Sequence, residues 1–150
     1  MGMLNLYDWG LPNQAEHLVR YKDNEPLYNM ARSLWNSLDY ASTCFLATAV
    51  VVAFALVCFY YYGYNKLPGR KYRRRYWVIW LVITAIATIV LTMILGNAMV
   101  SSTLNGQAGF ILRISLINGL YASVIYFILS FIICNLPAPT NAYRFLKLGK

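Results

Sequence analysis

Charged residues are scarce in this sequence. Only 12% of its 150 residues are charged and 59% are hydrophobic, whereas a soluble domain carries about 25% charged residues. Acidic residues are the rarest of all, since 5 Asp and Glu stand against 13 Lys and Arg. This shortage of charge predicts a protein with a lipid-exposed surface rather than a soluble globular domain.

Histidine and cysteine are almost absent as well. His17 is the only histidine, and the three cysteines, an odd number with no Cys-x-x-Cys pair, are Cys44, Cys58 and Cys134. Such a set does not support a zinc site or a disulfide framework. Ser101 and Ser102 have no histidine or carboxylate near them in the sequence, so a nucleophile with its base is also missing. We therefore expect no enzymatic activity, no metal and no cofactor.

Three long apolar stretches, whose only charged residue is Arg113, occupy nearly half the chain. They cover about residues 43–62, 77–99 and 110–133. About twenty residues of helix rise roughly 30 Å, which is the thickness of the hydrocarbon core of a bilayer. The predicted fold class is therefore an all-α integral membrane protein with three transmembrane helices.

The residues before the first span predict two further helices. Asn13 can begin a short helix that ends near Tyr21, and Asn24 can cap a longer one whose first turn contains Glu25. From Leu27 onward apolar residues recur at helical spacing, with charged residues on other faces. We expect an amphipathic helix over about residues 25–41, which either lies on the membrane or runs directly into the first span.

Basic residues are concentrated between the first two spans and after the third. The loop of residues 63–76 contains six, and the tail of residues 136–150 three, whereas residues 1–42 carry a net negative charge. The positive-inside rule predicts that residues 1–42 are extracytoplasmic. Residues 43–135 form the predicted transmembrane domain, and its basic loop and the tail that follows it are expected to be cytoplasmic. The loop residues expected to set topology and to contact anionic lipid headgroups are Lys66, Arg70, Lys71, Arg73, Arg74 and Arg75.

A bacterial inner (cytoplasmic) membrane is the expected location, with an organellar inner membrane as the alternative. A basic cluster can also indicate nucleic acid as a partner. Here the cluster lies directly beside two apolar spans, so we interpret it as a topology signal and expect no nucleic-acid binding. Tyrosines 60–62 and Tyr64 end the first span, and Tyr76, Trp77 and Trp80 begin the second. They predict two aromatic belts at one depth of the membrane.

Small side chains repeat every four residues along the second and third spans. Small residues let helix backbones approach closely in lipid, so the pattern is interpreted as a packing face. The predicted packing residues are Thr84, Thr88, Thr92, Gly96, Ser115, Gly119 and Ser123. One alternative is a water-lined stripe, with Thr84, Thr88, Thr92 and Asn97 facing a pore made by several copies; another is packing against a different protein. Asn118 is expected to bond to a neighbouring helix, and Arg113 to extend to the membrane interface.

The first eleven residues are unusually apolar for a short tail. Asp8 is their only charged residue, and a solvated tail has little reason to be so apolar. The segment is too short for a core of its own, so we interpret it as a docking segment for a partner protein. The predicted docking residues are Leu4, Leu6, Tyr7, Trp9 and Leu11.

Two functions fit these patterns. The first is a non-enzymatic structural subunit of a larger membrane assembly, of the secretion-apparatus, injection-apparatus or respiratory-complex type, with other membrane subunits as partners. The second is a pore formed by copies of the chain, either a membrane-permeabilising effector or a holin-like protein. Three spans with an outside N-terminus and a basic inside tail resemble one class of phage holins. That resemblance covers topology only, so it implies no functional residues.

Overall fold

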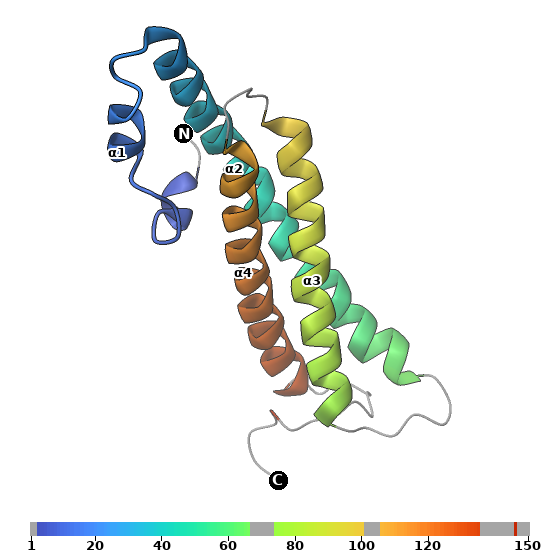
Figure 1. Cartoon of the computed structure of the whole chain (residues 1–150). Coiled ribbons are helices and arrows are strands. Elements are labelled where there is room, and N and C mark those ends of the chain that lie inside the picture. Colours follow the sequence, from blue (N-terminus) through green and yellow to red (C-terminus); the bar gives the residue numbers. More distant parts are fainter. Residues whose placement is uncertain (1–2, 67–73, 101–105, 136–145, 147–150) are drawn as a thin grey trace. The chain divides into compact units, whose positions relative to one another are not determined.

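The computed structural model describes residues 3–66, 74–100, 106–135 and 146. All regular structure in these residues is helical, which confirms the all-α fold (Figure 1). The elements are η1 Leu4–Tyr7, α1 Gln14–Val19, α2 Glu25–Cys58, η2 Phe59–Gly63, η3 Tyr64–Lys66, α3 Arg74–Met99 and α4 Gln107–Asn135. Of the short elements, η1 and η3 are 3-10 turns and η2 is a π-helical turn.

Three helical segments are long and apolar enough to cross a membrane. They are Glu25–Gly63, Arg74–Met99 and Gln107–Asn135. Each contains one of the three spans predicted from the sequence, so the prediction of three membrane-spanning helices is confirmed. The side of the membrane that each end faces stays a prediction.

The first span and the helix predicted before it form one continuous element. The Asn24 side chain accepts a hydrogen bond from the Leu27 N–H at 3.4 Å, as expected for its capping role, and α2 begins at Glu25. No glycine or proline occurs between Leu27 and Tyr62, so nothing in the backbone interrupts the helix. Residues 25–41 thus run directly into the span, the second of the two expected arrangements.

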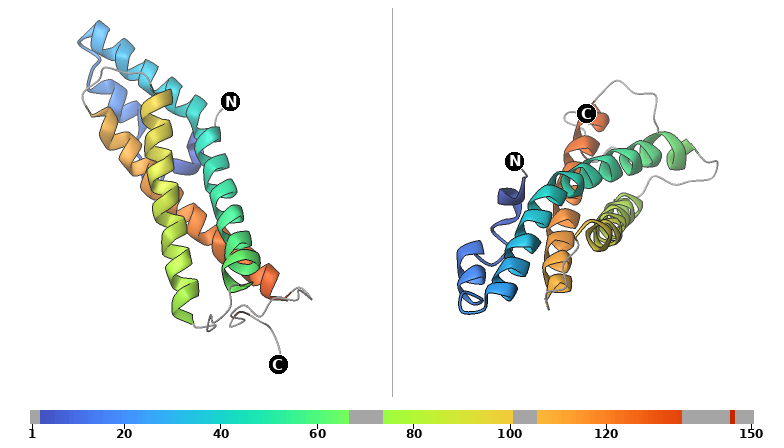
Figure 2. Two further views of the ribbon diagram at one scale, coloured as in Figure 1. Left: turned by 90° about the vertical axis from the view of Figure 1, so that its right-hand side faces the viewer. Right: turned by 90° about the horizontal axis from the view of Figure 1, so that it is seen from above.

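The chain divides into two compact units, and each long helix contributes to both. Unit 1 comprises Met1–Thr48 and Ile89–Asn118, and unit 2 comprises Ala49–Thr88 and Gly119–Lys150. In unit 1, α1 lies beside the first turns of α2 (Figure 2). The buried apolar residues of unit 1 come from η1 and its following loop, α2 and α4, and include Leu4, Tyr7, Leu11, Leu34, Trp35, Leu38, Phe45, Phe110, Ile111 and Ile114.

Aromatic side chains dominate the core of unit 2. Its buried cluster consists of Ala49, Ala53, Val57, Tyr60, Tyr61, Trp77, Ala122, Tyr126 and Cys134. The Tyr64 ring centroid lies 5.4 Å from that of Trp80 and 6.1 Å from that of Tyr76. These contacts bring the aromatic end of the first span to the aromatic start of the second, in agreement with the prediction that the two belts share one depth.

Much of the predicted basic loop lies outside the described residues. Arg70, Lys71 and Arg73 fall there, as does the tail of residues 136–150 apart from Leu146, and the side chain of Lys66 is not described. Arg74 and Arg75 are exposed in the first turn of α3. The Arg75 guanidinium lies 5.1 Å from the Tyr76 ring centroid, a cation–π distance.

Candidate functional site: a buried amide and the segment packed on it

Asn118 connects four segments of unit 1 through its side chain. Its Nδ2 donates to the backbone oxygen of Phe45 on α2 and to Thr92 Oγ1 on α3, both at 2.7 Å. Its Oδ1 accepts a hydrogen bond of 3.0 Å from the Tyr7 hydroxyl on η1. All four residues are buried, and we call them the Asn118 node. The predicted bond from Asn118 to a neighbouring helix is confirmed.

Three members of the Asn118 node, Phe45, Thr92 and Asn118, lie inside the predicted spans. Phe45 is two residues from the predicted start of the first span, and Asn118 is eight residues, about 12 Å of helix, from the start of the third. A primary amide at such depth has no water to bond, so leaving it unpaired would be costly. The node satisfies both amide hydrogens and the amide oxygen with protein partners.

Backbone hydrogen bonds between residues three positions apart recur along the chain from residue 3 to residue 10. Leu6 N–H donates to Met3 O at 3.1 Å, Asp8 N–H to Asn5 O at 3.4 Å and Gly10 N–H to Tyr7 O at 3.0 Å. Three residues per turn align positions i and i+3 on one face. One face therefore holds Leu4 and Tyr7, which are buried; a second holds Met3, Leu6 and Trp9, which are exposed; and a third holds the polar Asn5 and Asp8.

Two further contacts fix this segment to the long helices. The Met3 N–H donates to Ser42 Oγ on α2 at 2.7 Å. At the other end, a Cβ placed on Gly10 would come within 2.5 Å of Ile117 Cδ1 on α4, so the backbone passes directly over that helix. The segment is therefore part of the fold of unit 1 rather than a free tail.

This arrangement divides the predicted docking residues. Leu4, Tyr7 and Leu11 are buried within unit 1, whereas Leu6 and Trp9 remain exposed. The tail does not form a core of its own, but it completes one that is built by α2 and α4. Sequence reasoning missed this because the tail's partners are distant in sequence, with Tyr7 and Asn118 separated by 111 positions.

The predicted packing residues are almost all buried. Thr84, Thr88, Thr92 and Ser115 are completely buried, Gly96 and Gly119 are buried, and Ser123 is half-buried. Four of the hydroxyls donate to a carbonyl four residues earlier in their own helix, at 2.7–2.9 Å, and belong to Thr84, Thr88, Ser115 and Ser123. Such a bond pairs the hydroxyl within its own helix, so the hydroxyl needs no partner on a neighbouring helix.

Gly96 shows why one position of this series must be small. A Cβ on Gly96 would lie 2.7 Å from Cγ2 of Ile111 on α4, which is closer than real Cβ contacts. The Cγ2 atom of a β-branched side chain has little freedom to move away. Within unit 1, α3 and α4 therefore approach closely at this point.

His17 on α1 lies among aromatic rings. Its ring centroid is 5.0 Å from that of Phe110, 5.3 Å from that of Tyr21 and 6.1 Å from that of Trp35. His17 Nε2 and Trp35 Nε1 are both buried without a hydrogen-bond partner among the described residues. Burial, and then the charge of Arg20, hold the pKa of His17 below its ordinary value of 6.5.

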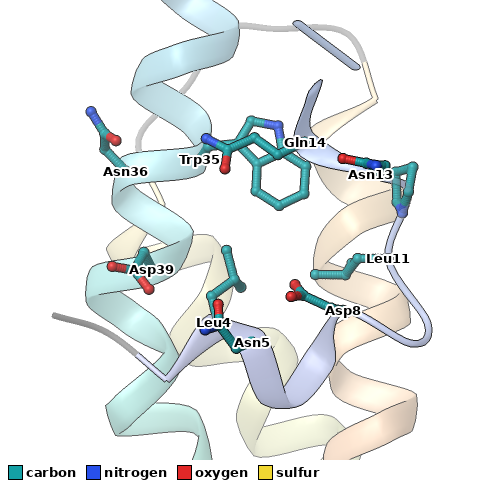
Figure 3. A pocket seen from close by; sticks show the side chains of 10 residues that line it. Leu4, Asn5, Asp8, Leu11, Asn13, Gln14, Trp35, Asn36 and Asp39 are labelled. Atoms are coloured by element: carbon teal, nitrogen blue, oxygen red, sulfur yellow. The ribbon is translucent and has the colours of Figure 1, made fainter. Parts of the chain in front are cut away.

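A polar pocket of about 620 Å³ adjoins the N-terminal segment. Asn5, Asp8 and Asn13 line one part of it, and Asn36 and Asp39 of α2 line another. In Figure 3, Leu4 lies between Asp8 and Asp39. No group of three or more His, Cys, Asp or Glu that could hold a metal ion occurs within the part of the chain that the structure describes.

Unit 2 contains two polar pairs that sequence analysis did not identify. The Trp77 indole N–H donates to Ser130 Oγ at 3.2 Å, and the Tyr61 hydroxyl and the Cys134 thiol are 3.1 Å apart. Both pairs are buried and join residues at least 53 positions apart. A helical pattern identifies a buried face but not which residue lies opposite, so no sequence signal could have found them.

No protein-family model, curated protein or solved structure matched the chain.

Proposed function

We propose that the chain is a non-enzymatic structural subunit of a larger multi-protein membrane assembly, of the secretion-apparatus, injection-apparatus or respiratory-complex type. The observation that carries this proposal is that the chain's buried polar groups form hydrogen bonds within the chain. The Asn118 amide, the Thr88 and Ser115 hydroxyls and the Trp77 indole all donate hydrogen bonds to groups of the chain itself. Intramembrane polar groups that serve a substrate or an ion path are expected to face a water-filled cavity instead.

The outward surface of the spans supports the same proposal. It is almost entirely apolar, with exposed Ile, Leu, Val and Phe along α2, α3 and α4. Such a surface suits both lipid and the apolar faces of neighbouring membrane subunits. In lipid, van der Waals packing rather than the hydrophobic effect selects between them.

A pore made by copies of the chain is the second candidate. Its motivating pattern was the threonine series with Asn97, which is exposed on α3. Burial of Thr84, Thr88 and Thr92 within the single chain disfavours it, since these hydroxyls would have to leave their present positions to meet water. Any pore would therefore have to be lined by other residues.

Native purification separates the two candidates. The chain would be tagged at its C-terminus in its own host, extracted in mild detergent and analysed by mass spectrometry. Foreign membrane subunits in fixed proportion support the structural role, whereas a ring of one protein that conducts ions in liposomes supports the pore.

A labelling experiment addresses orientation in the expected inner membrane. Reagents that cannot cross the membrane should reach cysteines placed at Leu67 or Gly69 only from the cytoplasmic side, and a cysteine at Ser102 only from outside. Labelling from the opposite sides would reverse the proposed N-out, C-in topology. Cys44 needs replacement in the test chain because its side chain is exposed.

A further inference from the structure

Two segments of unit 1 each present a carboxylate to the polar pocket. On the N-terminal segment, Asn5 and Asp8 share the polar face that the three-residue spacing creates. On α2, Trp35 and Asp39 lie one helical turn apart, and both line the pocket. The pocket volume of about 620 Å³ is typical of sites that bind small organic molecules. The pocket therefore has room for an organic ligand.

The charge of the pocket is opposite to that of the chain. The sequence has 13 Lys and Arg against 5 Asp and Glu, yet Asp8 and Asp39 line the pocket and none of its 10 lining residues is basic. Asp39 also takes part in another interaction of the chain. A carboxylate has two oxygens with several acceptor sites, so it keeps the capacity for a further donor. The pocket therefore favours a cation.

The remaining side chains supply hydrogen-bond acceptors and apolar contact. The amide side chains of Asn5, Gln14 and Asn36 line the pocket, and each contains one acceptor oxygen. Leu4 and Trp35 also line it, and both are buried. A primary ammonium group donates three hydrogen bonds and accepts none, whereas a methylene chain packs on apolar surface. The lining meets both requirements in one cavity.

The order of these groups indicates how many ammonium groups a ligand would carry. Figure 3 shows Leu4 between Asp8 and Asp39, so an apolar side chain separates two acidic ones. The complement of this order is two positive charges separated by methylene groups. We propose that the pocket binds a linear diamine, with one ammonium group paired to each carboxylate and the methylene chain packed on Leu4.

A metal ion and a lipid headgroup fit the pocket less well. Calcium takes six to eight oxygen ligands around one point, and the part of the chain that the structure describes has no group of three or more His, Cys, Asp or Glu to provide them. An ethanolamine headgroup carries one ammonium group beside a phosphate, and both carboxylates would repel that phosphate. A diamine carries no negative charge, so it avoids this repulsion.

Isothermal titration calorimetry of the full-length protein tests the proposal. The protein would be kept in a neutral maltoside detergent at low salt, because anionic lipids attract amines themselves and salt screens exposed charges. Putrescine and butylamine share a four-carbon chain and differ by one ammonium group. Putrescine should bind at a single saturable site and about fivefold more tightly than butylamine, since one partly exposed ion pair contributes about that factor.

Two matched variants locate the site. Asp8→Asn should weaken putrescine binding about fivefold and remove the preference for putrescine over butylamine, because one carboxylate is left. Glu16→Gln removes the same charge from α1 in the same unit, and Glu16 is exposed outside the pocket lining. The affinity of this variant for putrescine should equal that of the wild type. Asp8 is itself exposed, so both variants should retain the helical circular dichroism of the wild type.

Several results would overturn the proposal. The pocket is not a diamine site if neither amine binds, or if butylamine binds the wild type as tightly as putrescine does. Equal losses in Asp8→Asn and Glu16→Gln would reveal a diffuse attraction of cations to acidic residues. Tighter binding of glycerophosphoethanolamine than of putrescine would identify a lipid headgroup site instead. Binding by the isolated chain does not depend on the structural-subunit role, which native purification tests separately.

Discussion

Units 1 and 2 are built from the same three helices, yet different side chains hold them together. In unit 1 a small residue, Gly96, lets α3 approach α4, and a short amide, Asn118, reaches the backbone of α2. In unit 2 large rings fill the space, and an indole and a phenol bridge to Ser130 and Cys134. In unit 1 a short side chain is therefore enough to reach a carbonyl of another helix, whereas in unit 2 the bonds across helices come from long aromatic side chains.

The difference matters because no hydrophobic force drives helices together in lipid. Packing and hydrogen bonds must do so. Unit 1 depends on one residue that joins four segments, while unit 2 distributes its contacts over many rings and the polar contacts of Ser130 and Cys134. Single substitutions should therefore disturb unit 1 more than unit 2.

The largest effect is expected for Gly96→Leu. The new side chain would meet Ile111, and overpacking of this kind costs up to about 3 kcal/mol. Unfolding by a denaturing detergent in mixed micelles would measure the loss. Ala98→Leu is the matched control, since Ala98 is exposed on the same helix and should tolerate the same enlargement. Equal losses at both positions would show that close approach at Gly96 is not required.

Replacing Asn118 by Leu should lower the free energy of unfolding by about 2 kcal/mol, since three hydrogen bonds disappear at roughly 0.6 kcal/mol each. It should also loosen the N-terminal segment, which limited proteolysis would detect by faster cleavage within residues 3–13. Asn97→Leu removes an exposed amide from the same unit and serves as the control. Wild-type stability and cleavage in Asn118→Leu would contradict the idea that the node holds unit 1 together.

Ser130→Ala tests unit 2 and should cost about 1 kcal/mol, because the buried Trp77 indole loses its acceptor. The same detergent titration applies. In the control Ser123→Ala, the lost hydroxyl was bonded only within its own helix, to the Gly119 carbonyl, so the change should be close to neutral. A loss at Ser130 as large as that at Asn118 would remove the proposed contrast between the units.

The smallest expected effect is the response of α1 to acidic pH. The folded pKa of His17 lies below 6.5, so as pH falls through 6.5 the unfolded state binds a proton that the folded state resists. Attachment of α1 should therefore weaken below pH 6.5 and be unaffected above it. The protection factors of the α1 amides, which are corrected for the intrinsic slowing of exchange at low pH, would follow this change. In His17→Phe the dependence should vanish, and protection factors that do not fall on acidification of the wild type would contradict the assignment.

Much of the fold follows from features that lie close together in the sequence. Three apolar stretches with a single charged residue, Arg113, identified the spans, and Asn24 marked the start of α2 through its own side chain. Gly106, directly before α4, adopts a φ of 106°, which glycine readily allows. The four-residue spacing of small side chains likewise identified positions that turned out to be buried.

By itself the sequence determined which segments avoid water and which positions carry small or polar groups, because both properties belong to single residues and their near neighbours. Only the tertiary structure decided the pairings. Asn118 required a partner wherever it lay, but Tyr7 and the Phe45 carbonyl are 111 and 73 positions away. The division of the N-terminal segment into buried, exposed and polar faces was also decided there. A three-residue repeat becomes visible only once the backbone forms a 3-10 turn against α2 and α4.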